Sequence, residues 1–121
     1  MKRKPRVTVI DDDLIFGAML ARVAASEGIV VRHGASIDEI DPATLASTDV
    51  LVIDYHLEQG TGVELGQALH ERHIRKPILL ISASQDATRA SDWPDSIRSF
   101  ASKSVGVFGV LKSIHRILAA A

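Results

Sequence analysis

Polar side chains directly follow three short apolar runs of this 121-residue chain. Carboxylates bind hard cations such as Mg²⁺, and they also attack phosphoryl groups to give aspartyl phosphates. A hydroxyl group can donate a hydrogen bond to a phosphoryl oxygen. The runs and the polar residues that follow them are residues 7–10 with Asp11, Asp12 and Asp13, residues 50–53 with Asp54, and residues 78–81 with Ser82.

The apolar runs themselves predict where these polar groups lie. Unbroken Val, Ile and Leu residues indicate strands buried on both faces, which is the pattern of a parallel sheet. In open parallel sheets, ligands and chemistry lie just beyond the carboxyl ends of the strands. We therefore expect the carboxylates of Asp11, Asp12 and Asp54 to meet in one small acidic crevice. The Ser82 hydroxyl should face the same crevice.

Helical and strand-like spacings alternate along the whole chain. This alternation predicts a doubly wound α/β sandwich, in which helices cover both faces of a parallel sheet. The length suits a single domain, which we expect to cover residues 1–121. Strands are predicted at residues 7–10, 29–31, 50–54, 78–81 and 97–101, and helices at residues 14–27, after Ser36, and at residues 63–73, 86–92 and 107–120.

Several residues predict where helices begin, end and face the core. Gly28 is placed to end the first helix, and Ser36 with Glu39 has the pattern of a capping box. Pro42 is expected to end or reshape the short helix after Ser36. Residues 60–62 are expected to form a loop. The positions predicted to face the core are Phe16, Met19, Leu20 and Val23, then Leu65, Ala68 and Leu69, and finally Val107, Val110, Leu111, Ile114 and Leu118.

Composition excludes several classes of function. A formal net charge of −1 gives no general affinity for nucleic acid or an anionic membrane. The chain has no cysteine, so disulfides and thiolate chemistry are absent, which fits a reducing compartment. No run approaches the roughly 20 apolar residues of a membrane span, and the basic start lacks the pattern of a secretion signal. We expect a cytoplasmic protein.

An acidic crevice of this kind needs positive charge. Adjacent carboxylates repel one another, so a hard cation or a proton usually neutralises them, and Mg²⁺ prefers oxygen ligands. Phosphoryl transfer also needs positive charge and hydrogen-bond donors around the phosphoryl oxygens. Lys103 follows the fifth predicted strand and should reach the crevice. Ala83, next to Ser82, leaves space for a phosphoryl group.

Each of these residues also has an ordinary structural explanation. Asp11, Asp12 and Asp13 can cap a helix and complement its dipole. Asp54 can be a turn residue at a strand end, and Lys103 can be a solvated surface charge. The functional interpretation rests on the fact that all of them follow strands of one predicted sheet.

The ordered set of residues resembles the receiver domain of a two-component response regulator. The resemblance extends from Arg6 to about Leu118. Each motif is weak by itself, but the set at family-like spacing is highly specific. The matching positions are the acidic pair Asp11 and Asp12, the phosphoacceptor Asp54, the glycine Gly62, the switch residue Ser82 with Ala83 after it, the aromatic Phe100 and the lysine Lys103.

The resemblance implies a fold and a mechanism. The fold would be a flavodoxin-like (βα)5 sandwich with a parallel sheet of order 2-1-3-4-5. Mg²⁺, or Mn²⁺, would be held by Asp12, Asp54 and the backbone carbonyl of His56, with Asp11 acting through water. Asp54 would take a phosphoryl group from phosphohistidine. The Ser82 hydroxyl would then move inward, and Phe100 would follow.

The resemblance also implies the kind of partner. The phosphoryl donor would be a histidine kinase or a histidine phosphotransfer domain. Leu14 and Ile15 are apolar residues on the first helical turn, off the predicted core stripe, and could form part of its docking site. An output partner or a second copy would use the face of the fourth helix, fifth strand and last helix. No direct contact with nucleic acid or with a membrane is expected.

Four features depart from the family pattern. Glu58 stands where the family often has proline, and Ser104 replaces the proline that usually follows the lysine. A cis bond before a non-proline residue costs about 3 kcal/mol, so we expect a trans Lys103–Ser104 peptide. Phe100 lacks the hydroxyl of tyrosine, so a switch through it would work by packing. Residues 93–94, Trp-Pro, would shorten the fourth helix.

Three other classes of protein are weighed against a phosphorylated receiver. A pseudo-receiver would bind partners without phosphorylation, and the altered Lys103–Ser104 junction keeps this alternative open. A haloacid-dehalogenase-type phosphatase needs Thr or Val where this chain has Ile15, and generally needs a longer chain. A flavodoxin is disfavoured because a flavin phosphate needs amide and hydroxyl donors where Asp11, Asp12 and Asp13 lie.

Overall fold

Five strands form one parallel sheet in this computed structural model, which describes residues 3–83 and 93–120. Their order is β2-β1-β3-β6-β7, and every neighbouring pair is parallel. This is the predicted order 2-1-3-4-5, which is therefore confirmed. The strands are β1 (Arg6–Ile10), β2 (Val30–Gly34), β3 (Val50–Asp54), β6 (Ile78–Ser82) and β7 (Ile97–Ser102).

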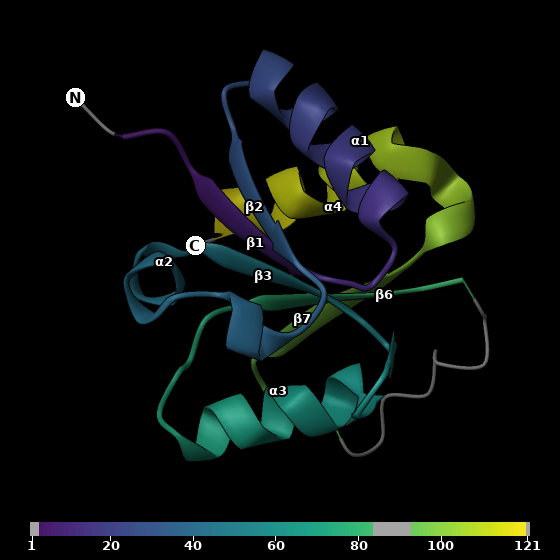
Figure 1. The fold of residues 1–121 in the computed structure, drawn as a ribbon. Helices are drawn as coiled ribbons and strands as arrows, with labels where there is room; N and C mark the ends of the chain where they lie inside the picture. Colours follow the sequence, from purple (N-terminus) through teal and green to yellow (C-terminus); the bar gives the residue numbers. More distant parts are fainter. Residues whose placement is uncertain (1–2, 84–92, 121) are drawn as a thin grey trace.

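Helices cover both faces of this sheet, as the sequence predicts. Figure 1 shows α1 and α4 side by side over one face, and α2 and α3 on the other. A hairpin of two short strands, β4 and β5, follows β3. The remaining elements are α1 (Leu14–Ser26), η1 (Ile37–Glu39), α2 (Pro42–Ser47), β4 (His56–Leu57), β5 (Gly60–Thr61), α3 (Gly62–Glu71), η3 (Lys103–Val105) and α4 (Gly106–Ala120).

The sheet divides the core into two apolar clusters. Every residue of β3 and β6 is buried, which confirms the interpretation of unbroken apolar runs as strands buried on both faces. Successive side chains of a strand point to opposite faces. Val52 therefore packs under α1 and α4, whereas Leu51 and Ile53 pack against α3. Apolar side chains thus pack on both faces of the three central strands, β1, β3 and β6. The predicted site lies at the carboxyl ends of these strands.

The region before α2 differs from the prediction. Ser36 makes no side-chain cap hydrogen bond, and Glu39 accepts from the Ala35 amide at 3.2 Å, so the predicted capping box is wrong. Pro42 begins α2 instead of ending a helix. A first-turn residue needs no amide hydrogen, and Asp41 caps the helix from the position before it.

A capping box does occur at a place where the sequence predicted a loop. The Thr61 hydroxyl accepts from the Glu64 amide at 3.1 Å, and the Glu64 carboxylate accepts from the Thr61 amide at 2.9 Å. The box begins α3 directly after the hairpin and starts the helix one residue earlier than predicted. Likewise, β2 runs from Val30 to Gly34, beyond the predicted residues 29–31.

The predicted helix faces are mostly correct. Gly28 follows the end of α1 with φ +77°, the left-handed conformation expected of a glycine there. Met19 was predicted to face the core but is 53% exposed, and Gly17 and Ala24 are buried instead. Ala68 also proves exposed. The helix predicted at residues 86–92 lies outside the described residues.

Within residues 3–83 and 93–120, no helix is long and apolar enough to cross a bilayer.

Candidate functional site

Three carboxylates meet at the carboxyl ends of β1 and β3. One oxygen from each of Asp11, Asp12 and Asp54 lies within 4.8 Å of the others. Asp11 is fully buried and Asp54 is 6% exposed, whereas Asp12 faces solvent. The sequence prediction that these groups converge is therefore confirmed. Ser82 is buried at the end of the neighbouring strand β6, one residue beyond the partner of Asp54 in the ladder.

Asp13 caps a helix, which is the structural alternative that the sequence left open for Asp11, Asp12 and Asp13. Its Oδ1 accepts from the Phe16 amide at 3.1 Å and so caps α1. Asp11 turns its Oδ1 toward the Asp13 amide at 3.0 Å, which orders the loop between β1 and α1. The Oδ2 of Asp11 points into the crevice, away from that loop contact.

Lys103 reaches the crevice from the end of β7. Its Nζ lies 2.7 Å from Asp11 Oδ2, 3.3 Å from Asp54 Oδ2 and 5.1 Å from the centre of the Phe16 ring. The peptide between Lys103 and Ser104 is trans, as expected. The Ser102 hydroxyl accepts from the Ser104 amide at 3.2 Å and starts the turn η3. A hydrogen-bonded serine turn thus presents the lysine where the family usually has proline.

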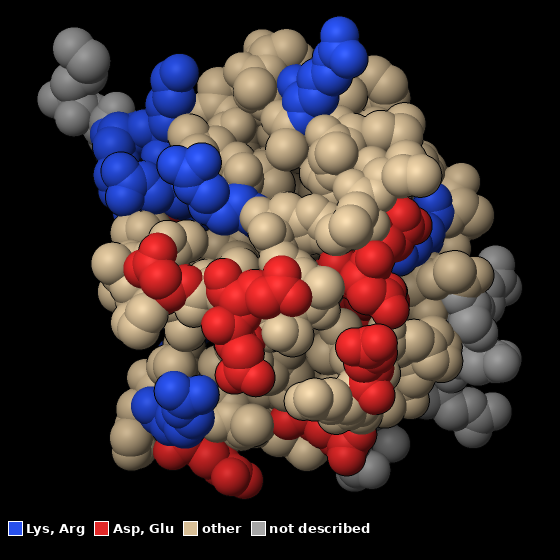
Figure 2. Space-filling view, in the orientation of Figure 1, with Lys and Arg blue, Asp and Glu red and all other residues tan. Residues whose placement is uncertain are grey.

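The electrostatics of the crevice favour a cation. Burial, and then the carboxyl group of Asp11, raise the pKa of Asp54 to about 6, although Lys103 and the His56 amide oppose this. Burial works against the ammonium, but the carboxylates of Asp11 and Asp54 outweigh it and raise the pKa of Lys103. Figure 2 shows acidic side chains gathered over the middle and right of the face that it draws.

The donor set fits a hard divalent ion. Asp11 Oδ2 is buried, and the Lys103 ammonium lies 2.7 Å from it as an ion pair. An oxygen in that state can accept from a metal-bound water. Carboxylate oxygens and water are the ligands that Mg²⁺ prefers. A single ammonium leaves three carboxylates with surplus negative charge, which such an ion would neutralise.

Comparison with known proteins decides the family. The family model described as "Response regulator receiver domain" matches residues 7–105. The chain belongs to this family. The match begins one residue into β1, includes the other four strands and the acidic crevice, and ends with the turn η3, which begins at Lys103.

Solved structures of receivers share the fold. A receiver protein from Burkholderia phymatum is 25% identical over 96% of each chain, with a TM-score of 0.77. TrrA from Thermotoga maritima, solved in complex with Mg²⁺-BeF, is 15% identical over 93% of this chain and 98% of its own, with a TM-score of 0.77. The response regulator StyR is 24% identical with a TM-score of 0.82, and this chain covers 60% of it.

The other predicted receiver residues lie around the crevice or beside it. Ala83 is exposed next to Ser82. Phe100 is half-buried on β7, with its ring centroid 6.5 Å from that of Trp93. His56 donates its backbone amide to Asp54 Oδ1 at 3.2 Å, and this contact holds the end of β3.

Five large apolar side chains of the described residues are exposed on α1, η3 and α4, and the sequence revealed only two of them. Leu14 and Ile15 on α1 are 64% and 74% exposed. Met19, Val105 and Phe108 are 53%, 53% and 71% exposed. Because α4 packs against both α1 and η3, we group these five residues under one name, the apolar patch. A helical wheel of α4 could have found Phe108, because it lies off the buried stripe.

Gly62 supports the floor of the site. Its amide donates to the Tyr55 carbonyl at 2.8 Å, and an added Cβ would lie 2.5 Å from the Asp54 backbone oxygen and 2.8 Å from Leu80 Cδ1. Gly62→Ala is expected to lower the free energy of unfolding by about 1–3 kcal/mol, because the added methyl group would push the end of β3, which carries Asp54, away from α3. Urea unfolding followed by circular dichroism measures this change.

Gly66 provides the matched control for Gly62 on the same helix. An added Cβ there would meet only ordinary contacts, the nearest at 3.4 Å from Ile97 Cδ1. Gly66→Ala is expected to match the wild type or to exceed it by up to about 1 kcal/mol, the gain in helix propensity. Equal losses at both glycines would contradict the close approach of α3 to Asp54.

Proposed function

We propose that Asp54 accepts a phosphoryl group from a phosphohistidine. The observation that supports this most is the position of its carboxylate, which shares a crevice with Asp11 and Asp12 and lies 3.3 Å from the Lys103 ammonium. A carboxylate oxygen of Asp54 attacks phosphorus, and the P–N bond to the donor breaks. Its electron pair returns to the imidazole nitrogen, which takes up a proton, and Asp54 becomes an acyl phosphate.

The same proposal assigns the metal ligands. Asp12, Asp54 and the backbone carbonyl of His56 would hold Mg²⁺, or Mn²⁺, directly, and Asp11 would act through water. Bound there, the ion supplies positive charge to the phosphoryl oxygens. The Lys103 ammonium supplies a second positive charge from the end of β7, at the same edge of the sheet. The proton on Asp54 has to leave before attack, so the reaction needs the carboxylate form.

The proposed switch runs from the Ser82 hydroxyl to Phe100. Ser82 would move toward the new phosphoryl group past the small Ala83, and Phe100 would move into the vacated space. Phe100 packs among apolar residues and Trp93 and has no hydroxyl, so its two positions would differ by packing alone. A phosphoryl group binds one arrangement better and shifts the population toward it.

The proposed input surface is the apolar patch. Leu14 and Ile15 lie on the first turn of α1, directly after the acidic loop, and Phe108 lies on the first turn of α4, which packs against α1; all three are mostly exposed. Receiver domains interact with histidine kinases or phosphotransfer proteins. We assign the patch to the docking of such a donor, whose phosphohistidine must come within reach of Asp54.

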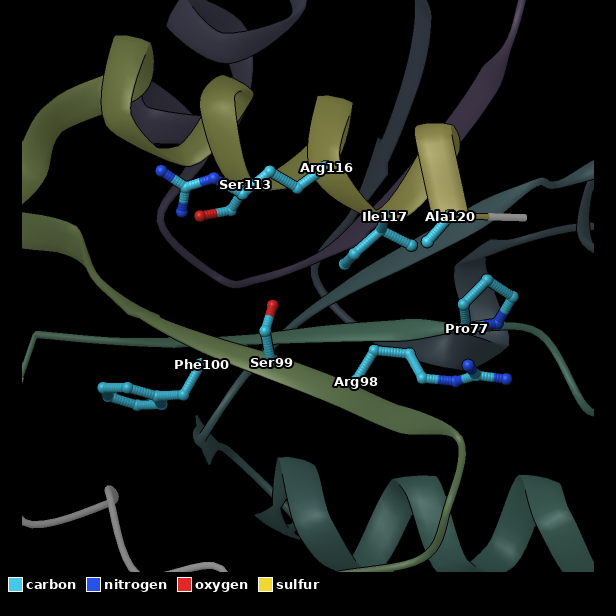
Figure 3. A pocket seen from close by; sticks show the side chains of 8 residues that line it. All are labelled: Pro77, Arg98, Ser99, Phe100, Ser113, Arg116, Ile117 and Ala120. Atoms are coloured by element: carbon cyan, nitrogen blue, oxygen red, sulfur yellow. The ribbon is translucent and has the colours of Figure 1, made fainter.

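The proposed output surface lies at the free edge of the sheet. A groove between β7 and α4 begins beside Phe100, and Figure 3 shows Ser99 pointing across it toward α4. Arg98 and Arg116 border the groove, and its apolar members include Ile117 and Pro77. An output protein or a second copy would bind here when Phe100 moves. We assign residues 1–121 to one receiver domain acting in the cytoplasm.

Phosphorylation without any kinase tests this proposal. Incubated with Mg²⁺ and phosphoramidate, the protein is expected to gain one phosphoryl group, which is seen as an added phosphate mass and is lost in base. Asp54→Asn should gain none. The result would also show that the receiver assists its own phosphorylation. Equal labelling of Asp54→Asn would overturn the assignment, and no labelling of the wild type would favour a pseudo-receiver.

A phosphorylated histidine phosphotransfer protein serves as the second donor. Phe108→Ser should slow transfer from this protein but leave labelling by phosphoramidate unchanged, because the small donor needs no docking surface. Ser113→Ala, on the groove side of α4, is the matched control for the same helix. Equal loss with both donors would show that Phe108 acts on the chemistry instead of the docking.

A further inference from the structure

An imidazole from the edge strand β2 holds the backbone of the acidic loop. We propose that His33, whose ring packs against Gly17, is a positioning residue: it fixes the position of the Asp12 carboxylate for metal binding. This inference rests on the proposed function, because it concerns the same metal site. Neither His33 nor Gly17 belongs to the set of positions on which the resemblance to receivers rests.

The contact between His33 and the loop is short and well defined. His33 Nε2 lies 2.7 Å from the backbone oxygen of Asp11, and the ring is half-buried. A carbonyl oxygen only accepts, so Nε2 carries the hydrogen and donates it. The ladder between β1 and β2 has already reached its last pair, Ile10 with Gly34. The side chain therefore adds one hydrogen bond beyond the end of the backbone ladder.

Asp11 is held from β2 on both sides of its Cα. Its amide donates to the Gly34 carbonyl at 3.0 Å, and its carbonyl accepts from His33. The first bond fixes the peptide before Asp11, and the bond from His33 fixes the peptide that joins Asp11 to Asp12. The direction of that peptide decides where the Asp12 side chain leaves the backbone. The carboxylate of Asp12 is the exposed member of the three, so no burial fixes it.

Gly17 makes room for the ring. A Cβ at this position would lie 2.2 Å from His33 Nδ1 and 2.3 Å from Cε1, so any larger residue would push the imidazole away. A glycine inside a helix costs about 0.5–1 kcal/mol relative to alanine. The ring thus lies directly on the backbone of α1 while bonding the loop. In this way, β2, the acidic loop and α1 are joined by one side chain.

Mg²⁺ affinity of the folded protein tests the role. His33→Phe keeps a ring but removes the donor, and its Mg²⁺ dissociation constant, measured by calorimetry, is expected to rise about tenfold, as for other groups that orient metal ligands. In His33→Gln the amide nitrogen can take the place of Nε2, so its affinity should stay within about threefold of the wild type. Wild-type affinity in a folded His33→Phe would overturn the proposal.

Gly17 variants keep the test informative if His33→Phe folds poorly. Gly17→Ala is expected to weaken Mg²⁺ binding about tenfold by displacing the ring. Adding His33→Ala to it should restore the urea midpoint, because the clash is gone, but not the affinity. Restored affinity in the double variant would overturn the proposal, since no donor would then be needed.

A metal-free measurement separates this inference from the proposed function. Long-range ¹H–¹⁵N spectra of the wild type should show Nε2 of His33 protonated, and His33→Phe should shift the Asp12 amide signal more than His33→Gln does. An unprotonated Nε2 would overturn the inference even in a protein that binds Mg²⁺. A wild type that binds no Mg²⁺ would instead contradict the metal site, whatever the state of His33.

Discussion

Replacing Asp54 with asparagine is expected to stabilise the metal-free receiver at pH 7, although it removes the proposed nucleophile. Asp54 is 6% exposed, and burial and Asp11 raise its pKa from an ordinary 3.8 to about 6. That difference corresponds to at most about 3 kcal/mol, by which the charged carboxylate destabilises the fold. The asparagine oxygen can still accept from the His56 amide, and Lys103 keeps its contact with Asp11.

The pH dependence fixes the sign of this effect. Between about pH 4 and pH 6 the folded protein holds a proton on Asp54 that the unfolded chain has lost, so the contribution of this group to stability falls as the pH rises. The advantage of Asp54→Asn should therefore be full above pH 6 and vanish near pH 4. Urea unfolding at several pH values, with EDTA present, measures it.

A surface carboxylate serves as the control for Asp54. Asp38 on the turn η1 is exposed, and Asp38→Asn should leave the unfolding free energy unchanged within about 0.5 kcal/mol. Added Mg²⁺ should stabilise the wild type and reduce the difference from Asp54→Asn, because the ion binds the folded carboxylates. A wild type more stable than Asp54→Asn in EDTA at pH 7 would contradict the conclusion that the charged Asp54 carboxylate destabilises the metal-free fold.

Lys103→Met is expected to produce opposite changes in metal binding and in phosphorylation. The Lys103 ammonium and a metal ion compete for the same carboxylates, so its removal should tighten Mg²⁺ binding by about tenfold, or 1.4 kcal/mol. Phosphorylation by phosphoramidate should nevertheless slow by about 10²–10³, because one of the charges that stabilises the transferring group is lost. Calorimetry and the rate of mass labelling measure the two changes.

Stability supplies a third measurement on the same variant. Asp11 is fully buried, and without Lys103 its charge is uncompensated, so metal-free Lys103→Met should lose about 3–5 kcal/mol of unfolding free energy. Lys76→Met is the matched control, because the Lys76 ammonium donates to the backbone carbonyl of Ala46 at the protein surface. If Lys103→Met bound Mg²⁺ more weakly than the wild type, the lysine would support the metal site instead of competing with it.

The sequence predicts the sheet and the site well because both follow from one property of the chain. Apolar runs at the centre of a parallel sheet have little freedom to be anything else, so their ends, Asp11 and Asp54, converge by topology alone. Helix boundaries were harder, because they depend on local competition. Pro42 fits a first turn as well as a stop, and Asp41, directly before it, decided between the two.

Other features could not be predicted from the sequence, because they depend on contacts between residues that are far apart along the chain. Met19 satisfies the helical spacing of the core stripe, but small residues on the same helix, Gly17 and Ala24, take its place. Gly17 is small because His33 lies on it, and those two residues are 16 positions apart in the sequence. The sequence predicts the trans Lys103–Ser104 peptide, but it gives no sign of the hydrogen bond from the Ser104 amide to the Ser102 hydroxyl that orders the turn.

The two-sided core has a consequence for how such a protein can change over evolution. The apolar patch belongs to helices that cover one face of the sheet, while Phe100 and Trp93 pack on the other. Between them stand the buried strands that carry Asp11 and Asp54. Substitutions in the patch can therefore change which donor is recognised without changing the packing of Phe100 and Trp93. The receiver can thus acquire a new upstream partner and keep both its phosphorylation chemistry and the packing around Phe100.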